Sequence, residues 1–130
     1  MKVLVATQKP FAPAAVNGIR QILEDAGHTV ALLEKYPDQS DLTASVSDAE
    51  ALIVRSDKVT AEVIAAAPSL KIVVRAGAGF DNVDLAAASA RGIVVMNTPG
   101  QNSNAVAELA LAMMIFMART QFTPATGHEI

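Results

Sequence analysis

The sequence of 130 residues contains no cysteine. This absence excludes a disulfide scaffold and catalysis by a cysteine nucleophile, and it suits a reducing compartment. A basic excess is also lacking, because the net charge is -3 at pH 7, so the composition does not favour a nucleic acid as partner. The length suffices for one domain with a real core and is too short for two comfortable ones.

Long hydrophobic runs are scarce as well. The N-terminus, MKVLVATQKP, has one lysine before an apolar run of four residues, which is too short for a signal-peptide core. The longest apolar stretch, residues 105–118, is interrupted by Glu108 and falls short of a membrane span. We therefore expect a soluble, cytoplasmic protein with no membrane partner.

Short β-branched runs alternate with alanine-rich stretches along the chain. The runs predict strands at residues 2–7, 29–34, 51–56, 71–76 and 92–98, and the other stretches predict helices near 13–26, 39–48, 60–67, 84–90 and 103–119. The strands are continuously apolar, which is typical of parallel strands covered on both faces. Gly27, Gly92 and Pro68 stand where helices are expected to end. The pattern predicts an α/β fold with a five-stranded, parallel, doubly wound sheet of flavodoxin-like type.

The expected domain organisation follows from the same pattern. Residues 1–102 would form the flavodoxin-like domain, and residues 103–119 would form a single helix. Residues 120–130, TQFTPATGHEI, lose the pattern and are interpreted as a tail or the start of a connection.

Polar residues follow two neighbouring apolar strands, and in open parallel sheets ligands bind beyond the carboxyl ends of the strands. Arg55 and Ser56 follow one strand, and Arg75 with the loop Ala76-Gly77-Ala78-Gly79 ends the other. Arginine offers a planar fork of donors for carboxylates and phosphates, and glycines let an anion approach backbone N–H groups. The alternatives are structural ion pairs with Asp57 or Asp81 for the arginines, and a plain strand-to-helix turn for the loop.

The two glycines look like the opening of a dinucleotide fingerprint, but the third glycine is missing. The fingerprint needs a glycine at position 82 and an acidic residue about 20 residues further on. Position 82 is Asn82, and residues 97–102, NTPGQN, contain no acid. A pyrophosphate cradle is therefore not expected in this loop, whereas a smaller anion such as a carboxylate fits it.

The C-terminal helix is apolar on nearly every face. Within AVAELALAMMIFMAR, residues 105–119, only Glu108 and Arg119 are charged, so the helix is expected to pack on another chain or domain. Asn102, Ser103 and Asn104 before it are good N-caps. His28 and His128 have no partner at a useful spacing, so neither a catalytic role nor a metal site is expected for them.

The stretches LIVRSDKVTAEVI and VVRAGAGFDNVDLAAASARGIVVMNTPGQNSNAVAELAL together resemble the D-isomer-specific 2-hydroxyacid dehydrogenases. The resemblance spans roughly residues 50–119, and residues 1–49 agree only in pattern. It implies the substrate-binding domain of an NAD-dependent enzyme. The two arginines favour the branch that oxidises 3-phosphoglycerate to 3-phosphohydroxypyruvate at the start of serine biosynthesis, because that substrate carries both a carboxylate and a phosphate.

The resemblance also implies a role for each candidate residue. The loop from Arg75 to Gly79, with Ala76, Gly77 and Ala78, would bind the substrate carboxylate through backbone N–H groups. Arg55 and Arg75 would reach the phosphate, with Ser56 beside them. Ala78 would lie near the nicotinamide of NAD, and Asn102 and Val106 would line the cleft beside the cofactor. The helix at residues 103–119 would cross to a nucleotide-binding domain and form a homodimer.

The family's glycine fingerprint, ribose-binding acid and catalytic arginine, glutamate and histidine all come later than this stretch. We therefore expect a part of a longer enzyme, with no catalytic residue in this chain, the catalytic residues beyond Ile130, and NAD bound mainly by the missing domain. The chain alone is expected to be inactive.

The alternative is a stand-alone, non-catalytic module on the same fold that binds a small acid or other proteins. A phosphoacceptor receiver domain would need an aspartate where Arg55 stands, and a flavodoxin would need a hydroxyl-rich loop in place of TQKPFAP.

Overall fold

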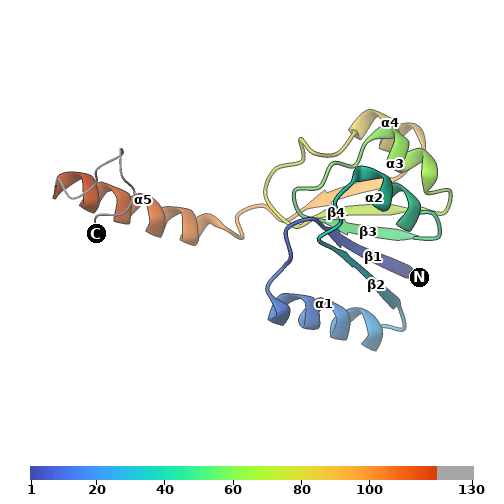
Figure 1. The fold of residues 1–130 in the computed structure, drawn as a ribbon, viewed down its shortest axis with the longest axis horizontal. Coiled ribbons are helices and arrows are strands. Elements are labelled where there is room, and N and C mark those ends of the chain that lie inside the picture. Colours follow the sequence, from blue (N-terminus) through green and yellow to red (C-terminus); the bar gives the residue numbers. More distant parts are fainter. Residues whose placement is uncertain (120–130) are drawn as a thin grey trace. The chain divides into compact units, whose positions relative to one another are not determined.

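The computed structural model describes residues 1–119 (Figure 1). The predicted tail at 120–130 lies outside the described residues. The described chain divides into two compact units, Met1–Pro99 and a second unit that begins at Gly100. No helix within residues 1–119 is both long and apolar enough to cross a membrane.

The first unit alternates strands with helices. The strands are β1 (Lys2–Thr7), β2 (Thr29–Glu34), β3 (Ala51–Val54), β4 (Ile72–Arg75) and β5 (Val94–Asn97), and the helices are α1 (Pro13–Asp25), α2 (Gln39–Ser45), α3 (Ala61–Ala66) and α4 (Leu85–Ala90). All neighbouring strands are parallel, and the order in the sheet is β2-β1-β3-β4-β5. Figure 1 shows α1 on one face of this sheet and α2, α3 and α4 on the other. The predicted five-stranded, doubly wound parallel sheet is confirmed.

The core lies between the sheet and the helices α2 to α4. Its fully buried side chains include Leu42, Leu52, Val54, Ile64 and Val73. Burying one such side chain stabilises the fold by about 1.5–3 kcal/mol. This packing fixes the ends of β3 and β4 beside each other, so the residues that follow these two strands lie at the same edge of the sheet.

The other sheet face is covered unevenly. The residues Val5, Ile53, Val74 and Met96 are register partners across four strands, so they share this face. Val5 on the inner strand β1 is 1% exposed, whereas Met96 on the edge strand β5 is 53% exposed. The edge strand β5 therefore carries apolar side chains that the first unit leaves exposed.

Three strands and two helices are shorter than predicted by two residues or more. The predicted strands 51–56, 71–76 and 92–98 each extend beyond the observed β3, β4 and β5, and the predicted helices 39–48 and 60–67 extend beyond α2 and α3. Gly92 belongs to the end of α4, because its φ is 66° and its N–H donates to the Ser89 carbonyl. Gly27 ends α1 in the same way, with a φ of 77°, and both glycines serve as the predicted helix stops.

The second unit contains α5 (Ser103–Ala118). Apolar side chains stand on all of its faces, and none of its residues is buried. Asn102 is the N-cap residue, but its side chain makes no capping hydrogen bond, so the prediction of side-chain capping is wrong for this helix. The backbone at Asn102 has a φ of -100° and a ψ of 4°, unlike the extended geometry that capping side chains use.

Candidate functional site

The loop after β4 offers unpaired backbone donors. The N–H of Ala76 donates to the Val54 carbonyl at 2.8 Å, and the N–H of Gly77 donates to the Arg75 carbonyl at 2.9 Å. Within residues 1–119, the next amides, those of Ala78, Gly79 and Phe80, donate to no protein group. Neighbouring free N–H groups attract an anion. Of the predicted loop donors, Ala76 and Gly77 are therefore engaged inside the protein, whereas Ala78 and Gly79 are available.

The side chain of Arg75 folds back onto this loop. Its Nε donates to the Arg55 carbonyl at 2.8 Å. Its guanidinium occupies the space beside Gly77, where a side-chain Cβ would come within 2.6 Å of the Arg75 Cζ. The residue is half-buried. Arg75 is thus oriented by a backbone carbonyl and leaves its terminal nitrogens for another acceptor.

Arg55 and Ser56 lie on the neighbouring strand end. Val54, the last residue of β3, is the register partner of Arg75, so Arg55 follows immediately beyond that level. Both Arg55 and Ser56 are exposed. Among residues 1–119, no acid forms an ion pair with Arg55 or Arg75, so the alternative of a structural pair with Asp57 or Asp81 is not found. The two strand ends therefore bring two arginine residues and three free amides to one edge of the sheet.

Asp57 has a structural role that the sequence did not reveal. The residue is 4% exposed, and its carboxylate accepts hydrogen bonds from the Gln8 N–H at 2.7 Å, the Tyr36 hydroxyl at 2.6 Å and the Arg55 N–H at 3.4 Å. These donors come from the segments that follow β1, β2 and β3. The carboxylate therefore fixes the loop that carries Arg55 and Ser56.

The stability of the fold is expected to fall as the pH rises above 10, because of Tyr36. Burial raises the pKa of the Tyr36 phenol far above its ordinary value of 10.0, and the hydrogen bond to Asp57 acts in the same direction. The unfolded chain loses this proton near pH 10 and the folded chain retains it, so the stabilisation is complete below pH 10 and is lost above it.

The measurement is a pH titration of phenolate absorbance, since Tyr36 is the one tyrosine in the sequence. Phenolate should appear only as the protein unfolds, and Tyr36→Phe should remove this part of the pH dependence. Ionisation of Tyr36 near pH 10 in the folded protein would contradict the expectation.

The loop after β4 is also tied to the edge strand. The Asn97 side-chain amide donates to the Ala78 carbonyl at 2.7 Å, and the Thr98 N–H donates to the Gly77 carbonyl at 2.9 Å. These bonds leave the Ala78 amide free while holding its carbonyl. Asn97 thus positions the loop through a hydrogen-bond partner that is 19 residues away in the sequence.

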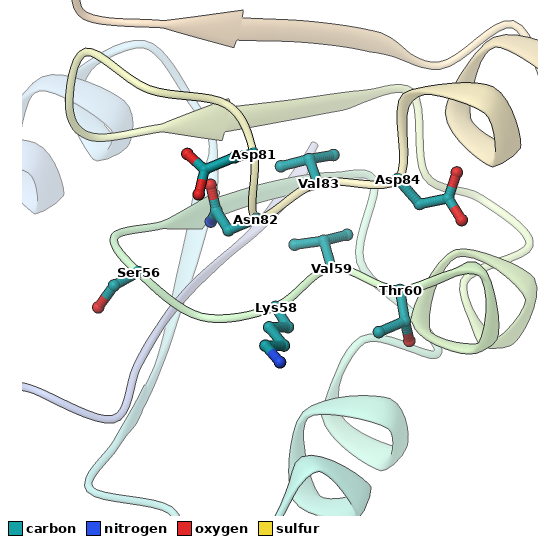
Figure 2. Close-up of a pocket in the computed structure, with 8 residues that line it drawn as sticks. All are labelled: Ser56, Lys58, Val59, Thr60, Asp81, Asn82, Val83 and Asp84. Atoms are coloured by element: carbon teal, nitrogen blue, oxygen red, sulfur yellow. The ribbon is translucent and has the colours of Figure 1, made fainter.

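Figure 2 shows a hollow where the loops after β3 and β4 run side by side. Its volume is about 520 Å³, and it is lined by Ser56, Lys58, Val59, Thr60, Asp81, Asn82, Val83 and Asp84. The loops are joined by hydrogen bonds from the Val59 N–H to the Asn82 carbonyl and from the Asp84 N–H to the Val59 carbonyl. Of the predicted site residues, only Ser56 lines this hollow.

Three of the polar side chains that line the hollow are hydrogen-bonded within the protein. The Thr60 hydroxyl accepts from the Val63 N–H, and the Asp84 carboxylate accepts from the Ala87 N–H at 2.9 Å. Asp84 is therefore the side-chain N-cap of α4. The Asn82 side-chain amide donates to the Asp57 carbonyl at 2.8 Å. The Oδ1 of Asn82 is buried and has no hydrogen-bond partner among residues 1–119. We take the two arginines with the free amides as the candidate site, because they combine cationic side chains with neighbouring free N–H donors.

Asn102 and Val106 belong to the second unit. Both are exposed, Asn102 directly before α5 and Val106 in its first turns. Their predicted place beside a cofactor stays a prediction.

A sequence model of the family described as "D-isomer specific 2-hydroxyacid dehydrogenase, catalytic domain" matches residues 6–127. The D-3-phosphoglycerate dehydrogenase of Mycobacterium leprae is 55% identical over 84 residues, and that of Homo sapiens is 50% identical over 101 residues. These alignments cover 64% and 77% of this chain, but 16% and 19% of the relatives. The chain thus spans less than a fifth of the length of these curated relatives.

A similar structure has been solved by crystallography. The NAD⁺-bound 3-phosphoglycerate dehydrogenase of Entamoeba histolytica is 57% identical to the chain and superposes with a TM-score of 0.86. The superposition covers 89% of this chain and 38% of that one.

Proposed function

The chain belongs to the D-isomer specific 2-hydroxyacid dehydrogenase family, and on that premise we propose that it is the substrate-binding part of an NAD-dependent D-3-phosphoglycerate dehydrogenase. The single observation that carries the proposal is that Arg55, Arg75 and the free loop amides lie at the same edge of the sheet. Such an edge offers donors for two anionic groups at once. The substrate, 3-phosphoglycerate, carries a carboxylate and a phosphate.

Different residues bind the two anionic groups of the substrate. The free amides of Ala78 and Gly79, with that of Phe80, bind the carboxylate. Arg55 and Arg75 bind the phosphate, and Ser56 adds a hydroxyl donor beside them. Ala76 and Gly77 shape the loop through their own backbone bonds. This division leaves the reacting C2 of the substrate between the two anchored ends.

NAD would be held mainly by a nucleotide-binding domain of the longer protein. The glycine loop does not fit a pyrophosphate, because the Arg75 guanidinium fills the space beside Gly77 and the Asn82 side chain is bonded to the Asp57 carbonyl. The exposed Ala78 offers its backbone or methyl group for a contact with the nicotinamide. The roles proposed for Asn102 and Val106 at the cofactor rest on the family resemblance. NAD supplies the hydride acceptor, and the residues of this chain bind and orient the acid.

The proposed place of the enzyme is the cytoplasm, at the first step of serine biosynthesis, where 3-phosphoglycerate is oxidised to 3-phosphohydroxypyruvate. The absence of cysteine in the sequence agrees with a reducing compartment. The names of the M. leprae and human relatives support the choice of substrate.

A calorimetric comparison of three ligands tests the proposed site. The ligands are 3-phosphoglycerate, D-glycerate, which lacks the phosphate, and glycerol 3-phosphate, which lacks the carboxylate. The site should bind 3-phosphoglycerate at least about tenfold more tightly than either analogue, because charge-assisted hydrogen bonds are lost in both. Equal affinity for all three, or no binding of any, would contradict the proposal.

The helix α5 is proposed to pair with a second copy of the chain. Its apolar side chains surround the helix, and a lone helix cannot bury them itself. Sedimentation equilibrium should therefore detect a dimer, and Leu109→Lys should shift the equilibrium toward monomer because a charge in an apolar interface is costly. Gln21→Lys at an exposed position of α1 adds the same single charge and serves as the control. A monomer across the whole concentration range would contradict this proposal.

A further inference from the structure

The Arg75 guanidinium occupies the space that a side chain on residue 77 would need. We call this space the seat of the guanidinium, and it exists because residue 77 is glycine. The three heavy atoms nearest to a Cβ built on Gly77 all belong to Arg75: its Nη1 in direct overlap, its Cζ at 2.6 Å and its Nε at 3.2 Å. A Cβ on Gly79 would lie 3.8 Å from the same Nη1. Gly77 is therefore crowded by one flexible side chain, and among residues 1–119 no other side chain or distant backbone comes as near.

That seat adjoins the unpaired donors of the loop. Ala78 and Gly79, whose amides are free within the described chain, follow Gly77 directly. The Arg75 Nε is held by the Arg55 carbonyl, so the guanidinium cannot leave the seat without losing that hydrogen bond. The placement of Arg75 beside the loop thus depends on Gly77 at one side and Arg55 at the other.

We propose that Gly77 is a positioning residue that seats the Arg75 guanidinium against the free amides, so that one loop selects an acid with two anionic groups. The identity of that acid rests on the proposed function. A methyl group at position 77 overlaps the seat, so the guanidinium must turn away from the loop. The loop amides remain, and a ligand with only a carboxylate is less affected than one with a phosphate as well.

Backbone strain is the competing effect of such a substitution. The φ of Gly77 is +158°, which a residue with a side chain rarely adopts. Backbone strain from Gly77→Ala would weaken binding whether or not position 75 carries an arginine. Displacement of the guanidinium weakens binding only when the arginine is present. A double-mutant cycle of Gly77→Ala and Arg75→Ala therefore separates the two.

The cycle is measured by calorimetric titration with 3-phosphoglycerate and with D-glycerate. Gly77→Ala should weaken 3-phosphoglycerate binding by about tenfold in the parent chain and by less than about twofold in the Arg75→Ala background. In the parent chain, Gly77→Ala should weaken the binding of D-glycerate less than the binding of 3-phosphoglycerate. Equal losses in both backgrounds would show that Gly77 acts through the backbone, and this would overturn the proposal.

A second measurement needs no ligand. In ¹H–¹⁵N spectra of the parent chain, the Arg75 Nε proton should exchange slowly, because it is hydrogen-bonded to the Arg55 carbonyl. Gly77→Ala should abolish this protection, and an unchanged signal would overturn the proposal. Gly18→Ala is the matched control, since a Cβ at Gly18 in α1 meets no atom within 4 Å. Failure of the parent to bind 3-phosphoglycerate would remove the proposed function, while this spectrum still decides the role of Gly77.

Discussion

Replacing Arg75 with alanine is expected to weaken the binding of 3-phosphoglycerate by about ten- to a hundredfold. A hydrogen bond to a charged group contributes about 1.5–3 kcal/mol, and the half-buried guanidinium is screened less than an exposed one. Arg55 is exposed and its side chain forms no ion pair among residues 1–119, so its own contribution should be smaller and more sensitive to salt. Arg75 thus carries the larger share of the phosphate contact.

The test is a calorimetric titration of four proteins: the parent, Arg75→Ala, Arg75→Lys and Arg55→Ala. Lysine keeps the charge but has neither the Nε donor for the Arg55 carbonyl nor the planar fork, so Arg75→Lys should recover only part of the affinity. The free energy of unfolding should change by only about 1 kcal/mol in Arg75→Ala, because one hydrogen bond is lost. Parent-like affinity of Arg75→Ala would remove Arg75 from the site.

Replacing Asp57 with alanine is expected to lower the free energy of unfolding by about 3 kcal/mol, the largest stability effect among the polar residues discussed. The substitution leaves the buried Tyr36 hydroxyl and the Gln8 amide without their acceptor, and each unpaired buried group costs about 1–3 kcal/mol. It also frees the loop that carries Arg55, because the Arg55 N–H loses its partner.

Urea unfolding of a small series isolates the effect of the carboxylate. Tyr36→Phe removes one donor and keeps the carboxylate, so it should cost only about 1 kcal/mol. Asp57→Asn keeps one acceptor oxygen and should fall between the two. Asp84→Ala serves as an exposed control that removes one helix cap, at about 1 kcal/mol. A loss below about 1 kcal/mol in Asp57→Ala would contradict the role of Asp57 as the tie between three loops.

The architecture could be predicted from the sequence because its determinants are local. Continuous apolar runs marked β1 and β2 at their observed bounds, and Gly27 and Gly92 marked the helix ends. The ends of β3 and β4 could not be predicted, since apolar runs do not show where pairing stops. Arg55 leaves the strand because its N–H turns to the Asp57 carboxylate, and that carboxylate is fixed from the segment after β1.

The candidate site could likewise be predicted from the sequence only in part. Arg55, Arg75 and the two glycines could be predicted to share an edge, because parallel strands end at the same edge. The hydrogen bonds that orient them join distant residues: Asp57 and Gln8 are 49 residues apart, and Arg75 and Arg55 are 20 apart. A sequence pattern carries no sign of such contacts. For the same reason the link between Gly77 and the Arg75 side chain emerged only from the structure.

The central claim is that the edge of the sheet at Arg55 and at residues 75–80 binds a phosphorylated carboxylic acid. It is tested most directly by following the backbone amide signals of the chain while 3-phosphoglycerate is added. The largest, saturable shifts are expected at Arg55, Ser56 and residues 75–80, with little change at Lys58 and Thr60 in the hollow of Figure 2. Shifts centred on that hollow, or no saturable shifts at all, would contradict the claim.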